Sequence, residues 1–397
     1  MKHGFYFRFF KVFHNETFCA LLSNLAYFLY CIKYKLAKLK TKSNIIDMTA
    51  KEAHKIIDEV YPKPDSKPEY INPEIDNSLD LSVIIPVYNH ADILEDNIKS
   101  ILNQKTTYNY EVIFVDDGST DGARDILKKY ENHPKVKLIF QQNGGIGAAR
   151  NTGINNASGK YIMFIDCDDT VHDNIIEVLM SEAYAKDCDM VMAAHNLVKE
   201  RNNQVYAVIP NIYPPRNLSG YKNGDSIMNY AGLPWGKVYK RELWNDVRFF
   251  PGYWYEDTII IFLLFSQCKK FSYIPEVIYE YKWYEDNFSH TQTGSKNVKA
   301  IDFYWLLKEI LVQYEKMVLE RNNALYTLVL RHISSYYYSK VNNMDDKVLT
   351  ALFVLAKELY LEYKPKEKVK LPYMLRQIEK AFDRNDIELW KLASQNI

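Results

Sequence analysis

The stretch YIMFIDCDDT, residues 161–170, joins a short apolar run to three carboxylates, Asp166, Asp168 and Asp169. The run shows no polar alternation, which is typical of a strand buried on both faces of a parallel sheet. Carboxylates at this spacing repel one another, and each raises the pKa of its neighbours. The cluster therefore favours a bound cation; the alternative is a solvated acidic turn in which Asp169 or Thr170 caps the helix that begins at Asp173.

Strand and helix patterns alternate through residues 81–195 around this stretch, as expected for an α/β domain with a mostly parallel central sheet. Apolar runs predict buried strands at 81–88, 111–116, 136–140, 161–165 and 189–195. Amphipathic or small-residue segments predict helices at 90–104, 120–132, 145–158 and 173–186. Because ligands bind beyond the carboxyl ends of parallel strands, Asp116 and Asp117 should face the same crevice as the cluster at 166–169.

Composition and missing motifs exclude several classes of protein. The chain carries 50 basic and 50 acidic residues among 397, so its charge gives no reason to expect a nucleic-acid partner. No GxGxxG follows the first strand and no GxxxxGK[ST] occurs, which disfavours a dinucleotide fold and excludes a P-loop NTPase. The five cysteines are irregularly spaced, which predicts a reducing, cytoplasmic compartment.

The two ends of the chain differ from its middle. Residues 1–42 hold eight Lys or Arg against one acid, and the apolar run at 18–32 is too short to span a bilayer. Either this segment contacts a membrane surface, on the inner face of the cell membrane, or it packs on the main domain. We predict a basic, amphipathic helical segment and linker (1–80), the α/β domain (81–292) and a helical C-terminal region (293–397). That last region is left open between homo-oligomerisation, membrane contact and acceptor binding.

Six motifs in the same order resemble the family 2 glycosyltransferases of GT-A fold, in particular those of bacterial capsule, exopolysaccharide and wall-glycan assembly. They are SVIIPVYN (82–89), VDDGSTDGA (115–123), QQNGGIGAARNTGI (141–154), YIMFIDCDD (161–169), PWGKVYKREL (234–243) and YEDTIIIFLL (255–264). The resemblance implies a Rossmann-like domain that binds a nucleotide-diphospho-sugar, in the first place a UDP-sugar. It also implies Mn²⁺ or Mg²⁺ as cofactor and inverting transfer to a glycan or lipid-linked acceptor.

The resemblance further implies roles for residues on the donor side. Pro86 and Tyr88 would border the base of the nucleotide, and Asp117 would accept a hydrogen bond from a uracil. Arg150 would reach the nucleotide or its diphosphate, because its guanidinium keeps its proton.

The metal would lie at the acidic cluster, because carboxylate oxygens suit Mg²⁺ and Mn²⁺. Asp168 would bind the ion directly, and Asp166 would contact the ribose or the metal. Lys282 stands where the family often has the first Arg of a basic pair, and Tyr284 replaces the second. His290 is a third metal ligand, a phosphate donor or an ordinary surface histidine.

The acceptor side requires a base, since a sugar hydroxyl does not ionise near neutral pH. The motif YED matches the family's acceptor side, so Asp257 is the expected base and Glu256 an acceptor-binding residue. Asp257 could instead be one of the acids that commonly begin a helix. Trp235 either stacks on a sugar or lies in the core.

Two other functions compete with the transferase. A sugar nucleotidyltransferase shares the sheet and the metal-binding acids, but it needs a GxGTR loop after the first strand, which this chain lacks. A catalytically degenerate homologue would act as a scaffold or subunit through the C-terminal helices, and the altered basic pair leaves this alternative open.

Overall fold

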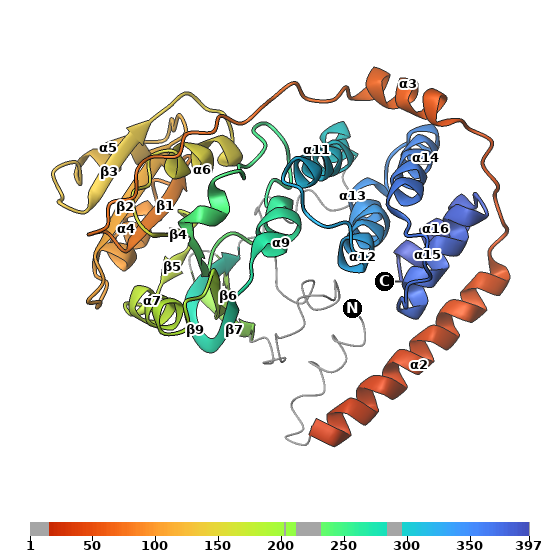
Figure 1. The fold of residues 1–397 in the computed structure, drawn as a ribbon, viewed down its shortest axis with the longest axis horizontal. Helices are drawn as coiled ribbons and strands as arrows, with labels where there is room; N and C mark the ends of the chain where they lie inside the picture. The colour runs from red at the N-terminus through yellow and green to blue at the C-terminus, as the bar shows by residue number, and fades with distance from the viewer. Residues whose placement is uncertain (1–15, 202–203, 212–231, 284–295, 397) are drawn as a thin grey trace. The chain divides into compact units, whose positions relative to one another are not determined.

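The computed structural model describes residues 16–201, 204–211, 232–283 and 296–396, and the statements below concern these residues (Figure 1). The chain divides into two compact units. The larger comprises residues 64–291 and 305–320, and the smaller comprises residues 1–63, 292–304 and 321–397.

A single sheet forms the centre of the larger unit, with strand order β3-β2-β1-β4-β8-β6-β9-β5 and β7 paired to β6. The strands are β1 (Leu81–Val87), β2 (Tyr110–Asp116), β3 (Val136–Phe140), β4 (Tyr161–Phe164), β5 (Thr170–Val171), β6 (Met190–Arg201), β7 (Gln204–Asn211), β8 (Lys237–Lys240) and β9 (Phe271–Trp283). β1 to β4 are mutually parallel, and so are β6 and β9. The prediction of an α/β fold with a mostly parallel sheet is therefore confirmed.

The helices of this unit follow the predicted alternation. They are α4 (Leu94–Leu102), α5 (Ala123–Lys128), α6 (Ile146–Ile154), α7 (Ile175–Lys186), α9 (Phe265–Gln267) and most of α11 (Asp302–Lys316). One difference lies in the middle of the sheet. The predicted fifth strand is β6, but β8 separates it from β4 and runs antiparallel to both.

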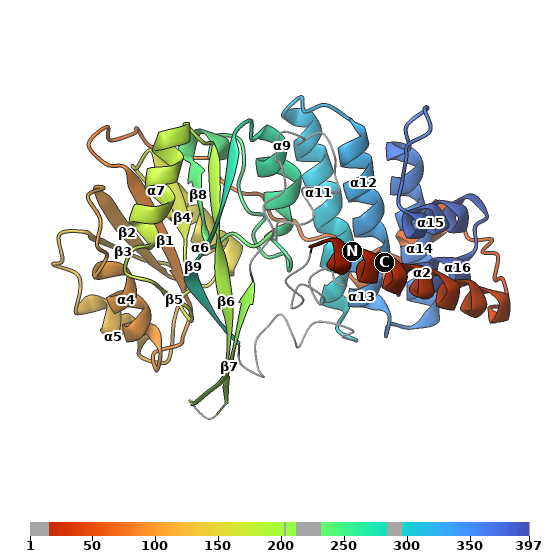
Figure 2. The ribbon, with the colours of Figure 1, turned by 90° about the horizontal axis from the view of Figure 1, so that it is seen from below.

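Side chains of β1 alternate between two helical layers. Val83 and Ile85 belong to a core cluster with residues of α4 and α7, and α7 crosses this face of the sheet in Figure 2. Ile84 points to the opposite face, where a Cβ added at Gly153 of α6 would lie 2.2 Å from its Cγ2. All seven residues of β1 are buried, as expected for a central parallel strand.

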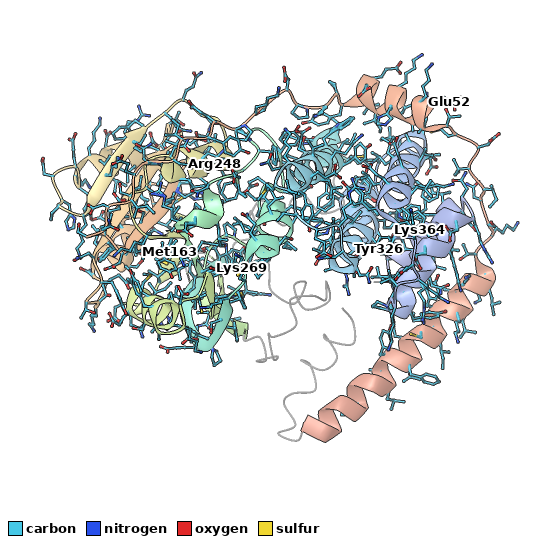
Figure 3. The ribbon with its side chains drawn as sticks, in the orientation of Figure 1. Glu52, Met163, Arg248, Lys269, Tyr326 and Lys364 are labelled. Atoms are coloured by element: carbon cyan, nitrogen blue, oxygen red, sulfur yellow. The ribbon has the colours of Figure 1, made fainter. Side chains whose placement is uncertain are left out.

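The side chains of β4 show the same alternation. Met163, labelled in Figure 3, joins the α4 and α7 core. Phe164 lies on the other face, with ring centroids 5.2 Å from Trp244 and 5.7 Å from Phe249. This aromatic layer fixes the segment after β8 against the end of β4, which positions the residues that follow both strands.

The smaller unit is helical, as predicted for the C-terminal region. It contains α2 (Glu16–Lys40), α3 (Ala50–Val60), α12 (Asn323–Arg331), α13 (Tyr337–Val341), α14 (Asp346–Tyr363), α15 (Tyr373–Asp383) and α16 (Ile387–Ser394). No helix in the described part of the chain is both long enough and apolar enough to cross a membrane.

The N-terminal helices belong to this C-terminal unit, which differs from the expected division at residue 80. Tyr30 donates its hydroxyl to the Asn396 carbonyl at 2.6 Å, and His54 Nε2 lies 3.1 Å from Glu358 Oε2. Ile57 of α3 is fully buried, and α3 packs against α14. These helices therefore pack on residues more than 300 positions further along the chain, whereas the packing alternative had placed the segment on the main domain.

Candidate functional site

The two acidic groups lie at one edge of the sheet, as expected. β1 pairs in parallel with β2 on one side and with β4 on the other. Asp116 ends β2, and Asp166 follows two residues after the end of β4. The carboxyl ends of three neighbouring parallel strands therefore share this edge, where ligands bind in open α/β sheets.

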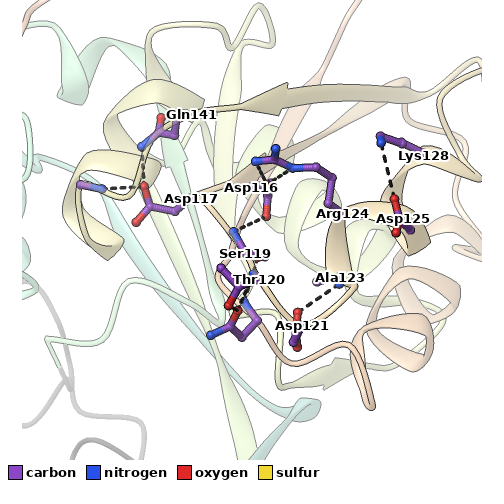
Figure 4. A network of polar contacts seen from close by, with 12 residues as sticks. Asp116, Asp117, Ser119, Thr120, Asp121, Ala123, Arg124, Asp125, Lys128 and Gln141 are labelled. Atoms are coloured by element: carbon purple, nitrogen blue, oxygen red, sulfur yellow. Dashed lines mark hydrogen bonds and ion pairs between the residues drawn. The ribbon is translucent and has the colours of Figure 1, made fainter.

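Asp117 is buried, with 2% of its surface exposed, and holds the turn that begins α6 (Figure 4). Its carboxylate accepts hydrogen bonds from the backbone of Gly144 at 2.9 Å, the backbone of Gly145 at 2.8 Å and Gln141 Nε2 at 2.7 Å. Burial raises the pKa of Asp117, and these hydrogen bonds oppose that shift. Because a carboxylate has about four acceptor positions, about one remains for a ligand. Its contact with a uracil stays a prediction.

Asp116 is neutralised by a neighbouring arginine (Figure 4). Arg124 donates to Asp116 Oδ2 through Nη2 at 2.6 Å and through Nε at 2.8 Å. The Ser119 backbone donates to the other oxygen at 3.1 Å. Asp116 therefore shapes the loop after β2, and its charge is already paired.

The turn after β1 borders the same edge. Pro86 is buried inside β1, whereas Tyr88 is 48% exposed. Asn89 and His90 both have left-handed backbone angles, φ 64° and 65°, which are uncommon outside glycine. The Asn89 backbone donates to Ser119 Oγ at 2.8 Å, which ties this turn to the loop after β2. Of the two residues predicted to border the nucleotide base, only Tyr88 has an exposed side chain.

Asp169 anchors the acidic turn to β9. It is fully buried and accepts hydrogen bonds from the Tyr279 hydroxyl at 2.6 Å and the Lys282 backbone at 2.8 Å. Burial, and next Asp168 and Asp166, raise its pKa well above the ordinary value. The helix-cap alternative is wrong, because α7 begins at Ile175 with Asn174 before it.

Asp168 is the carboxylate of the cluster best suited to a cation. Burial, and then the charge of Asp166, raise its pKa to about 6, while His90 and Lys282 lower it. No group of three potential metal ligands forms among the residues with a described position, and His290 lies outside them. The carboxylates of Asp168 and Asp166 nevertheless fit Mg²⁺ or Mn²⁺, because such ions are commonly held by one or two carboxylates together with substrate phosphates. His90 was not predicted from the sequence as a site residue, although its charge acts on Asp168.

Arg150 connects the acidic turn to the acceptor-side motif. It is 2% exposed, and its guanidinium donates to Asp166 Oδ1 at 2.8 Å and to Glu256 Oε1 at 2.5 Å. Burial would lower the pKa of Arg150, but the carboxylates of Asp166, Glu256 and Asp257 raise it above the ordinary value. The structure places this guanidinium between two carboxylates, an arrangement that sequence reasoning missed. Its predicted reach to the nucleotide stays a prediction.

Asp257 is half-buried and directly precedes a helical segment that contains a π-helical turn at Ile260–Leu264. Lys237, at the start of β8, is 1% exposed, and its ammonium donates to the Leu233 carbonyl at 2.5 Å. Burial lowers the pKa of Lys237 to about 7, and the charge of Asp257 opposes this shift. The charge of Asp257 therefore acts on two buried basic side chains, those of Lys237 and Arg150.

Trp235 is 4% exposed and stacks on two tyrosines of β9. Its ring centroid lies 4.5 Å from Tyr279 at an interplanar angle of 10°, and 5.2 Å from Tyr281 at 15°. His195 contacts it edge-on at 4.9 Å. These contacts favour the core alternative over stacking on a sugar.

Comparisons with known proteins agree with this geometry. The model of the family described as Glycosyl transferase family 2 matches residues 82–243. The uncharacterised glycosyltransferase YibD of Escherichia coli K12 is 31% identical over 241 residues, which are 58% of this chain and 70% of YibD. The glycosyltransferase GlyG of Streptococcus pneumoniae serotype 4 is 30% identical, over 60% of this chain and 79% of GlyG.

A solved structure shares the fold. The crystal structure of S. aureus TarS residues 1–349 in complex with UDP-GlcNAc superposes with a TM-score of 0.63 at 20% sequence identity. The match covers 80% of this chain and 91% of that one. At this identity the likeness shows a common GT-A-like fold.

Proposed function

The chain belongs to glycosyltransferase family 2, and from this premise we propose that it is an inverting, metal-dependent transferase that uses a UDP-sugar. The acceptor is a hydroxyl of a glycan or of a lipid-linked glycan in bacterial surface polysaccharide synthesis, and the reaction takes place in the cytoplasm. One observation carries the proposal. The Arg150 guanidinium donates hydrogen bonds both to Asp166, near the proposed metal ligand Asp168, and to Glu256, next to the proposed base Asp257. This shared partner supports a single site for both halves of the reaction.

The donor side would bind the nucleotide against Tyr88 and the turn that Asp117 holds. The TarS structure contains UDP-GlcNAc, which supports a nucleotide-sugar donor for this fold. A divalent cation, when bound, would neutralise the charge that develops on the departing diphosphate. Asp168 and Asp166 would hold this ion. The ammonium of Lys282 would add positive charge, since its charge already acts on Asp168.

The acceptor side would use Asp257 as the base. The acceptor oxygen attacks the anomeric carbon as the bond from that carbon to the diphosphate oxygen breaks, and the hydroxyl proton passes to Asp257. Glu256 would be held by Arg150 and would orient the acceptor or its neighbour Asp257. Catalysis then depends mainly on positioning and on the stabilisation of charge.

The test is a UDP-release assay with a panel of UDP-sugars in the presence of Mn²⁺ or Mg²⁺. Asp257→Asn should lower transfer by about 10²–10⁴-fold, because it removes a general base. UDP affinity should stay within about twofold of the wild type, since Asp257 is on the acceptor side. Asp173→Asn is the matched control, because this acid is about half exposed and pairs, at 2.6 Å, with Lys105, which belongs to neither motif.

Each outcome has a clear meaning. If Asp257→Asn retains transfer, the base is another group. If no donor is turned over while UDP still binds, the degenerate scaffold alternative replaces the enzyme. A nucleotidyltransferase would instead form a UDP-sugar from UTP and a sugar phosphate, and this activity is measured in the same preparation.

A further inference from the structure

Helix α2 of the smaller unit has one face fixed by neighbouring helices. Tyr30 donates to the Asn396 carbonyl at 2.6 Å, and Lys38 donates to Gln377 Oε1 at 3.1 Å. Tyr34 is 1% exposed and lies edge-on to Tyr373, with ring centroids 6.0 Å apart. Figures 1 and 2 both show α2 alongside α15 and α16. These contacts determine which face of α2 points outward.

The outward face is apolar. Six large side chains on it are between 38% and 83% exposed: Leu25, Phe28, Leu29, Ile32, Leu36 and Leu39. At about 100° per residue they fall within an arc of about 100°, so they form one continuous band along the helix, here named the α2 stripe. A stripe of this kind on a soluble protein marks a surface that binds a partner.

Lysines border the α2 stripe on both sides. On the helical projection the exposed Lys35 lies on one edge, and the exposed Lys33 and Lys40 lie on the other. No acidic residue occurs anywhere from position 17 to position 46. The surface offered to a partner is therefore apolar in the middle and positively charged along both margins.

This charge pattern decides between two occupants. The spacing of Leu25, Leu29, Ile32, Leu36 and Leu39 would also fit the seam of a coiled coil with a second copy. Such a seam would bring the lysines of both copies together with no acid to pair them. An anionic lipid surface instead neutralises the lysines while its acyl region receives the apolar side chains.

We propose that α2 lies in the plane of an anionic bilayer, with the α2 stripe inserted at the boundary of the acyl chains and Lys33, Lys35 and Lys40 at the headgroups. This inference goes beyond the proposed function, because it requires no sugar chemistry. Membrane binding and transfer to a soluble acceptor can be measured separately, so either can fail while the other holds.

The experiment is co-sedimentation of the full chain with vesicles of phosphatidylcholine alone, and with vesicles containing about one third phosphatidylglycerol. The wild type should bind the anionic vesicles much more strongly, and added salt should weaken this binding. Leu36→Glu should lower the partition coefficient at least about tenfold, because a leucine that the proposal inserts at the acyl chains is replaced by a charge.

Leu361→Glu is the matched control, because Leu361 of α14 and Leu36 are each 57% exposed. This variant should bind vesicles within about twofold of the wild type. The triple variant Lys33→Gln, Lys35→Gln, Lys40→Gln should have a partition coefficient on anionic vesicles about a hundredfold below that of the wild type. Each lysine should account for about tenfold or less of this decrease. The circular dichroism spectrum and the Tm of each variant are compared with those of the wild type to verify that the smaller unit remains folded.

Three results would overturn the proposal. The wild type could fail to bind anionic vesicles. Leu36→Glu could bind as well as Leu361→Glu. Light scattering could reveal a dimer that Leu36→Glu dissociates, in which case a second copy covers the stripe.

Discussion

Replacing Arg150 by methionine tests the link between the two halves of the site. Methionine keeps an unbranched side chain of similar length but removes the charge. In the wild type the guanidinium lies 2.8 Å from Asp166 and 2.5 Å from Glu256 and is almost fully buried. In Arg150→Met these two carboxylates face one another with no cation between them.

The cost follows from the burial of the three side chains. Removing one partner of a buried ion pair typically costs about 3–5 kcal/mol, because the remaining charge is left unpaired. Here two carboxylates lose their partner, but their side chains are 21% and 13% exposed and can regain some hydration. We therefore expect a loss of about 3–5 kcal/mol in the free energy of unfolding of the larger unit, not twice that amount.

The assay is denaturant unfolding followed by tryptophan fluorescence. Five of the six tryptophans belong to the larger unit and only Trp390 to the smaller, so the signal reports mainly on the unit that contains Arg150. Arg248→Met is the control (Figure 3). Arg248 is also buried, but its hydrogen bonds go to amide and backbone oxygens, including Asn155 Oδ1 at 2.8 Å and the Ile71 carbonyl at 2.6 Å.

A charge-neutral substitution separates the two variants. Glu256→Gln removes one of the two facing carboxylates, so the deficit caused by Arg150→Met should shrink in a Glu256→Gln background. The deficit of Arg248→Met should be the same in both backgrounds, because it exposes no such pair. A loss below about 1 kcal/mol for Arg150→Met, or an equal deficit in both backgrounds, would refute the reasoning.

Three further outcomes are expected. Asp168→Ala should weaken UDP binding in Mn²⁺ but not in EDTA; calorimetry that finds equal wild-type affinities in the two buffers rejects the metal role. Burial lowers the pKa of His195 to about 4, so the wild type should lose up to about 3 kcal/mol of stability as the pH falls from 6.5 to 4, and none above 6.5. His195→Gln should lack this loss in parallel unfolding curves, and identical curves would contradict the assignment. Gly153→Ala places a Cβ 2.2 Å from Ile84 Cγ2 and should cost about 1–3 kcal/mol, and much less in an Ile84→Ala background; an equal cost in both backgrounds counts against the clash.

The sequence predicted the elements with long, uniform patterns. β1, β2 and β4 are apolar runs without polar alternation, and the acids that follow them had to share an edge once the strands were parallel. β8 was missed because it has four residues and comes three positions after Pro234, so its pattern is too short to distinguish from a loop. Its partners in the sheet are set by tertiary pairing.

The side-chain partners at the site were much less predictable. The charge of Arg150 indicated an anion, and a phosphate was as reasonable as the two carboxylates that it contacts. Asp169 resembled a helix cap because a helix follows it, yet its partner Tyr279 lies 110 positions away. Contacts of this kind depend on how strands are ordered in the sheet, and that order is not encoded in local spacing.

The insertion of β8 between β4 and β6 has a consequence for engineering. The antiparallel pairing of β6 with β8 places Met192 opposite Lys237 and Val191 opposite Val238. We expect this register to be independent of the length of the chain that connects the two strands. Cassettes exchanged between residues 201 and 232 among relatives should therefore leave Lys237 in register with β6. Chimaeras made at these two junctions would test whether this segment sets the acceptor preference of the proposed transferase.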